Sequence, residues 1–279
     1  MCLSPKEIIE AYISASKNKA AMSVGTVLGK AAMAGMMIAM GAAGSSVAAH
    51  AITNVGLARF VAGLVFPVGL MMVILLGAEL FTGDCLMAAA LPNKDISVLQ
   101  FMKVLILVYI GNFIGAALLV LAVFYSGQFD YTSGLLGAYT IKVAAGKAAI
   151  TPVKALSSGI LCNILVSAAV LMAMASKDVT GKLLASFFVI MLFVTSGYEH
   201  CVANMYYITA GLFAKTNETY VNVAMSQCGV TEAQLAALNF KNMLVNNLLP
   251  VTIGNIIGGS GCVGLVVFYL SGAAKKGNK

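Results

Sequence analysis

Two short polar segments interrupt long apolar stretches of this 279-residue chain, and both carry groups that can contact an ion. In "VTSGYEHCVANMYY" the pair Glu199 and His200 follows a glycine, and in "ELFTGD" Glu79 is followed by Thr82. An imidazole can donate a hydrogen bond and exchange a proton, and a hydroxyl can donate or accept. We therefore expect Thr82 and His200 to contact a small polar solute.

The composition is that of an integral membrane protein. Hydrophobic residues make up 60% of the chain and charged residues 10%, whereas a soluble domain carries roughly 25% charged residues. Six apolar runs exceed the roughly 18 residues that indicate a transmembrane helix. They are continuous and not alternating, which favours helices over a barrel. The runs cover about 30–51, 58–91, 102–126, 153–175, 183–214 and 244–271.

The second and fifth runs are longer than the roughly 20 residues of one crossing, and the two polar segments lie within them. Matched discontinuous helices are the best sequence pointer to a binding site inside a membrane. A half-helix that begins at mid-membrane presents unpaired N–H groups and a positive dipole end. Two such ends predict an anion site without a fixed full charge.

Three pairs of segments indicate an internal repeat. "KAAMAG" resembles "KALSSG" (offset 154 − 30 = 124), "ELFTGDCLM" corresponds to "EHCVANMYY" (199 − 79 = 120), and "GNFIGA" resembles "GNIIGG" (254 − 111 = 143). The order is the same in both halves, and each half contains three spans. Because three is odd, the second half enters from the opposite side, which predicts a 3+3 inverted repeat with the pathway between the halves.

Glu79 and Glu199 need a reason to lie in the membrane, where a lone carboxylate is costly. We expect both to accept hydrogen bonds from loop N–H groups and not to contact the ligand, because a negative wall would repel anions. Bulky apolar residues near the breaks are expected to form two hydrophobic constrictions around a small wet pocket. They are Phe66, Leu70, Leu80, Phe81 and Phe193.

Lys147, in "AAGKAAITP", precedes the fourth span together with Lys142 and ahead of Lys154. These lysines are either solvated loop residues or a basic outer vestibule that concentrates anions. Of the 17 Lys and Arg residues, 11 are assigned to the side of the membrane on which the N-terminus lies. By the positive-inside rule both termini are expected in the cytoplasm, with the protein in the cell membrane.

We expect three regions along the chain. Residues 1–28 have no signal-peptide pattern and carry apolar residues at helical spacing, which predicts an amphipathic helix on the membrane surface. These residues are Ile8, Ile9, Tyr12 and Ile13. Residues 29–272 form the six-helix channel domain, and residues 273–279 form a basic cytoplasmic tail.

Several other functions are not supported by the sequence. The net charge of +7 comes without a basic stripe interleaved with aromatics, so no nucleic-acid partner is expected. The six cysteines form no CxxC pair, so we expect no disulfide framework, no metal site and no cofactor. Ser196 and His200 lack a Gly-x-Ser-x-Gly elbow, which argues against a hydrolase. The protein is not expected to be an enzyme.

The segments "ELFTGD", "GNFIGA", "LCNILV", "GYEHCVANMYY" and "NNLLPVTIGNIIGG", in this order over nearly the whole chain, resemble the signature segments of the formate/nitrite transporter family. The resemblance implies an aquaporin-like fold of six helices and a homopentamer with one pore in each protomer. It also implies passage of small monovalent anions such as formate, nitrite or hydrosulfide. Among the branches of the family, the chain looks most similar to the hydrosulfide channels.

The resemblance implies roles for individual residues. Those expected along the pore are Thr82, Phe81, Leu80, His200, Lys147, Asn163 and Val166. Those expected at apolar constrictions are Phe66, Leu70 and Phe193, and those expected to orient the loops are Asn247 and Asn255, beside Glu79 and Glu199. One departure is Asp84, which adds negative charge near an anion path.

The expected mechanism begins with an anion attracted to Lys147, which loses water at an apolar slit and binds between Thr82 and His200. Since a bare ion in a dry constriction is costly, His200 is a candidate proton donor that lets a weak acid cross in neutral form. A passive channel and a proton-coupled transporter share this architecture. A water or small-solute facilitator is a weaker alternative, because the nearest match to an Asn-Pro-Ala triplet is Ala203-Asn204-Met205.

Overall fold

The structure is a computed structural model that describes residues 2–273. Among these residues the chain is helical and forms no β-sheet. Six helical segments are long and apolar enough to cross a membrane, which confirms the predicted all-α, six-span architecture. These spans are Val24–Ala49, Val55–Leu76, Val98–Tyr125, Pro152–Ala175, Val179–Ser196 and Phe240–Leu270. The basic tail predicted at 273–279 lies, apart from Ala273, outside the described residues.

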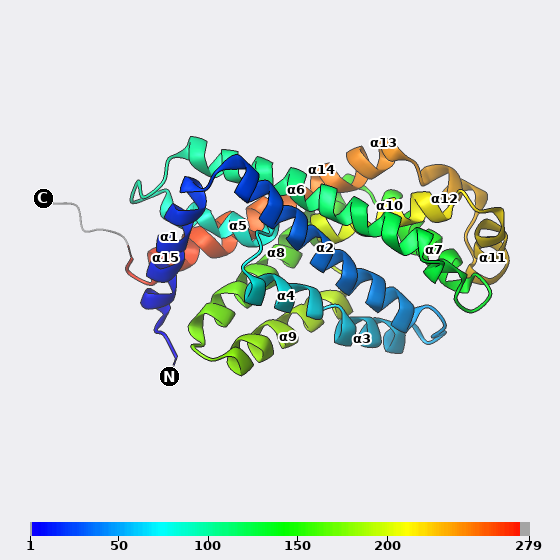
Figure 1. The fold of residues 1–279 in the computed structure, drawn as a ribbon, viewed down its shortest axis with the longest axis horizontal. Coiled ribbons are helices and arrows are strands. Elements are labelled where there is room, and N and C mark those ends of the chain that lie inside the picture. Colours follow the sequence, from blue (N-terminus) through cyan, green and yellow to red (C-terminus); the bar gives the residue numbers. More distant parts are fainter. Residues whose placement is uncertain (1, 274–279) are drawn as a thin grey trace, which may run out of the picture.

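The elements follow one another along the chain as labelled in Figure 1. The α-helices are α1 Pro5–Ala21, α2 Val24–Ala49, α3 Val55–Val65, α4 Val68–Leu76, α5 Phe81–Asp84, α6 Val98–Tyr125, α7 Leu135–Ala148, α8 Pro152–Ala175, α9 Val179–Ser196, α10 Cys201–Ala214, α11 Glu218–Cys228, α12 Glu232–Ala237, α13 Phe240–Asn242, α14 Leu249–Ile256 and α15 Val266–Leu270. Short 3₁₀ helices are η1 Cys85–Ala90 and η2 Gln128–Asp130, and π-helical segments of the sixth span are η3 Met243–Leu248 and η4 Ile257–Leu265.

The spanning helices run roughly along the long axis of the molecule (Figure 1). Helices α1 and α15 lie at one end, here called the α1 end, and α7 and α11 lie at the other, the α7 end. Side-chain caps begin several of these helices: Ser23 accepts from the backbone N–H of Thr26 at α2, and Ser97 with Gln100 forms a capping box at α6. Such caps satisfy N–H groups that a helix start leaves unpaired.

The second and fifth spans are broken, as predicted. Helix α4 ends at Gly77 (φ +66°) and α9 ends at Gly197 (φ +72°), both in the left-handed conformation that glycine adopts at little cost. The chain then runs extended into Leu80 and His200, from which α5 and α10 begin. The second span is also divided before Pro67, whose ring is incompatible with a helix interior.

The two halves repeat the same contacts with a register that differs from the sequence prediction. A Cβ on Gly111 would approach the carbonyl of Leu28, and one on Gly254 would approach that of Leu156. The residues of the first and fourth spans therefore correspond at a separation of 128 (156 − 28), one helical turn away from the offset of 124 inferred from "KAAMAG" and "KALSSG". Chance similarity of small residues misplaced this pair by one turn.

Small residues let the paired spans approach closely. A Cβ on Gly115 of α6 would lie 1.9 Å from the carbonyl oxygen of Ala32 in α2, and one on Gly258 would lie 2.4 Å from that of Ile160 in α8. Backbones this close exclude any larger side chain, which is typical of helix packing in membranes. These contacts fix how the two breaks face each other.

Helix α1 confirms the predicted amphipathic spacing but not its place on a lipid surface. Ile9, Tyr12 and Ile13 are buried against the protein, where α1 contacts η1, α8, α6 and α15. The hydroxyl of Tyr12 donates to the carbonyl of Gly83 at 2.7 Å. Protein, and not lipid, covers this apolar face, because α1 packs on the first break and on η1, which follows it.

Helix α7 was not predicted, since its residues were assigned to a loop. It stands in the second half where α1 stands in the first, directly before the first span of its repeat. Lys19 in the last turn of α1 and Lys147 in the last turn of α7 are separated by 128 residues (147 − 19), the separation found for the spans that follow. Each repeat therefore begins with a shorter helix that precedes its three spans.

Candidate functional site

The two breaks bring Thr82 and His200 into contact. The Thr82 Oγ1 atom lies 3.0 Å from His200 Nε2, although the residues are 118 positions apart. Both side chains are buried within the bundle. The sequence predicted that these two groups lie together, because the two broken spans enter from opposite sides. In the structure the two side chains are in contact.

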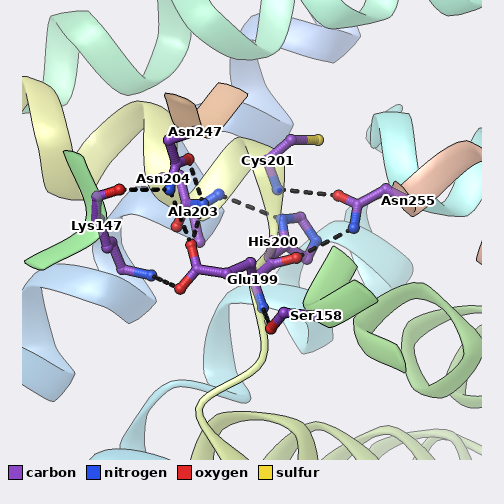
Figure 2. A network of polar contacts seen from close by, with 9 residues as sticks. All are labelled: Lys147, Ser158, Glu199, His200, Cys201, Ala203, Asn204, Asn247 and Asn255. Atoms are coloured by element: carbon purple, nitrogen blue, oxygen red, sulfur yellow. Dashed lines mark hydrogen bonds and ion pairs between the residues drawn. The ribbon is translucent and has the colours of Figure 1, made fainter. Parts of the chain in front are cut away.

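The hydrogen bonds around His200 assign its tautomer. The backbone N–H of Ala203 donates to Nδ1 at 3.2 Å, so Nδ1 carries no proton in this arrangement (Figure 2). The neutral ring then has its proton on Nε2 and donates it to the oxygen of Thr82. This leaves the hydroxyl proton of Thr82 free to point toward an acceptor in the pathway.

Asn255 holds the second break. Its Oδ1 accepts from the backbone N–H of Cys201 at 3.0 Å, and its Nδ2 donates to the carbonyls of Gly159 (2.8 Å) and Glu199 (3.1 Å). Figure 2 shows the bonds of Asn255 to Cys201 and to Glu199. Asn255 therefore orients the loop, as the sequence interpretation proposed.

Asn112 holds the first break in the same way. Its Oδ1 accepts from Phe81 N–H at 3.0 Å, and its Nδ2 donates to the carbonyls of Ala31 (2.8 Å) and Glu79 (3.0 Å). The sequence interpretation missed this residue, although "GNFIGA" had been paired with "GNIIGG". The two asparagines accept from the first backbone N–H of α5 and of α10, so these two donors are not available to an ion.

Asn163 connects the two breaks and does not face a cavity with its amide. Its Nδ2 donates to the carbonyl of Thr82 at 3.1 Å and to that of Asn255 at 2.6 Å. The side chain is fully buried in α8. Asn163 thus fixes the backbone of Thr82, and its predicted place along the pore stays a prediction.

Glu199 accepts from side chains and not from the loop N–H groups that were predicted. Its carboxylate lies 2.8 Å from Lys147 Nζ, 2.6 Å from Asn204 Nδ2 and 3.1 Å from Asn247 Nδ2 (Figure 2). Lys147 and the two asparagine amides provide the donors that a buried carboxylate needs. Lys147 is thus a helical residue bound to a carboxylate and not a solvated loop lysine.

Glu79 is also held by lysines and not by loop N–H groups. Lys19 Nζ lies 2.6 Å from Glu79 Oε2, and Lys30 Nζ lies 3.8 Å from Glu79 Oε1. Lys19 also binds the carboxylate of Asp84, so two acidic side chains share one ammonium group. The negative charge that Asp84 adds near the pathway is therefore partly neutralised from α1.

A narrow cavity reaches His200 from the α7 end. It has a volume of about 150 Å³ and is lined by Phe66, Phe193, Lys147 and His200 among others. The rings of Phe66 and Phe193 meet edge to face at 5.7 Å, and the Phe193 ring lies 5.8 Å from that of His200. A wider cavity of about 730 Å³ shares Lys147 with it and opens beyond.

A second cavity approaches the site from the α1 end. It has a volume of about 370 Å³, and its apolar lining includes Leu70, Val73, Leu80 and Val170. The two cavities lie on either side of the contact between the breaks, with an aromatic pair on one side and aliphatic side chains on the other.

Comparison with known proteins decides the family. A family model described as formate/nitrite transporter matches residues 6–269. This chain belongs to the formate/nitrite transporter family. Its relatives and structural neighbours are channels and transporters, so this family member is a membrane transport protein and not an enzyme.

Individual relatives cover most of the chain. It is 40% identical over 216 residues to "Formate channel FocA" of Haemophilus influenzae, covering 77% of this chain and 75% of that one. It is 36% identical over 275 residues to "Uncharacterized transporter YrhG" of Bacillus subtilis, covering 95% and 92%.

Solved structures agree in fold. One described as "Pentameric formate channel with formate bound" has a TM-score of 0.80 at 33% identity and covers 88% of this chain and 97% of its own. Another, described as "FNT family ion channel", has a TM-score of 0.79 at 26% identity, covering 95% and 98%. The aquaporin-like inverted repeat is therefore the fold of this formate/nitrite transporter.

Two residues predicted along the pore of this transporter are not among those that line the two cavities next to the breaks. The ring of Phe81 packs edge to face on Tyr109 at 5.1 Å and lines a groove between α6 and α14, on a different side from the two cavities. Val166 is buried in α8, and Val170, one turn later, lines the α1-end cavity instead. A periodic apolar helix gives no sequence signal that separates these neighbouring faces.

Proposed function

We propose that this formate/nitrite transporter is a passive channel for small monovalent anions, namely formate, nitrite or hydrosulfide. We propose further that it works as a homopentamer with one pore in each protomer, in the cell membrane, with both termini and the α1 end in the cytoplasm. The names of the relatives support a formate-type substrate, and one similar structure is described as pentameric. The excess of lysine at the α1 end supports the orientation.

The observation that carries the proposal is the contact of Thr82 with His200 between two apolar constrictions. An anion in the gap accepts the free hydroxyl proton of Thr82, because the ring of His200 already donates to the Thr82 oxygen. This donor offsets part of the cost of dehydrating the anion. Phe66 and Phe193 then form the constriction toward the α7 end, and Leu70 and Leu80 form that toward the α1 end.

The bond from Ala203 supports a channel over a proton-coupled transporter. A second proton on His200 would occupy Nδ1, which now accepts from the Ala203 N–H at 3.2 Å. Protonation therefore requires this bond to break and places two donors face to face. In the proposed channel His200 stays neutral and orients Thr82, in contrast to the proton-donor role considered from the sequence.

Flux and electrical recordings on purified protein in proteoliposomes test this function. The anions compared are formate, nitrite, hydrosulfide and chloride across a range of pH. We expect Thr82→Val to lower formate flux by about ten- to a hundredfold, the loss of one hydrogen bond to a charged group. Thr252→Val is the matched control, because its hydroxyl contacts Tyr109 at 3.1 Å away from the pathway.

His200→Asn separates the two mechanisms. A passive channel predicts unitary currents and a lower flux whose dependence on pH follows that of the unsubstituted protein. A flux that loses its pH dependence in His200→Asn, together with an absence of currents, contradicts the channel and supports coupled proton transfer through the ring.

A further inference from the structure

The two half-helices that end at the breaks place negative dipole ends beside the entry cavities. Among the described residues, the carbonyls of residues 74–77 at the end of α4 and of 195–197 at the end of α9 accept no hydrogen bond. A helix C-terminus carries roughly half a negative charge. Gly77 lines the α1-end cavity and Gly197 lines the narrow α7-end cavity, so both ends oppose the entry of an anion.

Arg59 lies over the end of α9. A Cβ built on Gly197 would be 3.4 Å from Arg59 Nη1 and 3.8 Å from Nη2, so the guanidinium covers the last turn of the half-helix. Arg59 is in the second turn of α3 and lines the wide cavity at the α7 end. It is also the single arginine of the chain.

Lys182 lies near the start of the other broken span and lines the cavity at the α1 end. It is in the first turn of α9, and Ile74 and Gly77 from the last turn of α4 line the same cavity. Helix α9 packs against both α3 and α4, which run in the opposite direction (Figure 1). Each of the two broken spans therefore carries a basic residue near its start, beside the cavity in which the other half-helix ends.

Arg59 and Lys182 differ in their pairing from the lysines beside the two breaks. Lys142 also lines the wide cavity without an ion-pair partner among the described residues, but the atoms nearest to a Cβ on Gly197 belong to Arg59. Lys147 is bound to Glu199, and Lys19 and Lys30 are within ion-pair distance of Glu79. Arg59 and Lys182 have no carboxylate within ion-pair distance in the described part of the chain. The field of a paired lysine is largely cancelled by its partner, whereas an unpaired cation attracts anions from the mouth of a cavity.

We infer that Arg59 and Lys182 are the entry residues of the pathway, one for each end, and that they attract small monovalent anions past the negative ends of α9 and α4. This inference rests on the proposed anion channel and assigns the attraction to Arg59 in place of Lys147. The paired lysine Lys147 serves instead to hold Glu199 and the second break.

Formate flux through Arg59→Gln and Lys182→Gln tests the inference, measured as influx and as efflux in vesicles of uniform orientation. At about 20 mM ionic strength we expect the flux that enters from the end where the substituted residue lies to fall about three- to tenfold in each variant. At about 500 mM the difference is expected to disappear, because screening shortens the reach of a charge to a few ångströms. Arg59→Lys and Lys182→Arg are expected to retain the flux of the unsubstituted protein.

Lys154→Gln is the matched control at the α7 end, and Lys103→Gln is the matched control at the α1 end. Both lysines are exposed and lie near the start of a spanning helix. Flux through Arg59→Gln and Lys182→Gln equal to that of these controls overturns the inference and leaves the channel intact. A loss that is the same at both salt concentrations, or that the charge-conserving variants share, overturns it as well by indicating a structural role. Absence of anion flux in the unsubstituted protein overturns the proposed function itself.

Discussion

Lys19 and Lys147 hold equivalent carboxylates on opposite sides of the contact between Thr82 and His200. Lys19 Nζ lies 2.6 Å from Glu79 Oε2, and Lys147 Nζ lies 2.8 Å from Glu199 Oε1. In each case the glutamate stands directly before the residue from which the next half-helix begins. Helices α1 and α7 thus pin the two breaks in place through one buried ion pair each.

Lys147→Met is expected to destabilise the protein by about 3 kcal/mol, because it leaves Glu199 buried with only amide donors. The double variant Lys147→Met with Glu199→Gln is expected to recover most of this loss, since a neutral amide needs no cation. Thermal unfolding of the detergent-purified protein measures both. Equal melting temperatures for the single and double variants would contradict a charge-pair role.

Lys19→Met is expected to destabilise the protein far more than Asp84→Asn does. Loss of Lys19 leaves two buried carboxylates without their shared ammonium and is expected to cost about 3 kcal/mol or more. Asp84→Asn removes one of two like charges that share one cation, and Asp84 Oδ2 has no hydrogen-bond partner to lose. We expect the free energy of unfolding of Asp84→Asn to lie within about 1 kcal/mol of that of the unsubstituted protein. A loss as large as that of Lys19→Met would argue against shared pairing.

Asn112→Ala and Asn255→Ala are expected to have closely similar effects, because each asparagine makes three bonds to the backbone of one break. Each substitution leaves buried backbone groups unpaired, at a cost of about 3 kcal/mol. Asn246→Ala is a control, as its amide makes one long bond of 3.4 Å. Thermal unfolding and formate flux are the measurements, and an effect confined to one of the two asparagines would contradict their equivalence.

Gly115→Ala is expected to prevent tight packing of α6 on α2, because the added Cβ would lie 1.9 Å from the carbonyl oxygen of Ala32. We expect a loss of at least about 2 kcal/mol and a lower yield of folded protein. Gly29→Ala, with no neighbour within 4 Å of its Cβ, is expected to be neutral or slightly stabilising. Size-exclusion profiles and melting temperatures of the two variants check the comparison.

Local features of the sequence determined the spans and their breaks. Long apolar runs must form helices in lipid, and a glycine followed by Glu79 or Glu199 within such a run cannot continue as a buried apolar helix without cost. The opposite entry of the two halves follows from counting spans. These properties depend on residues adjacent in the chain, so no tertiary information was needed.

Tertiary packing decided which side chains meet. The register of 128 residues between α2 and α8, the pairing of Lys19 with Glu79, and the turn of Phe81 toward Tyr109 all depend on how the helices are rotated about their axes. A rotation by one residue, about 100° in a helix, changes the face that a side chain occupies. Apolar helices in a membrane lack a polar stripe that would fix this rotation from the sequence, so close contacts such as that of Gly115 with Ala32 fix it instead.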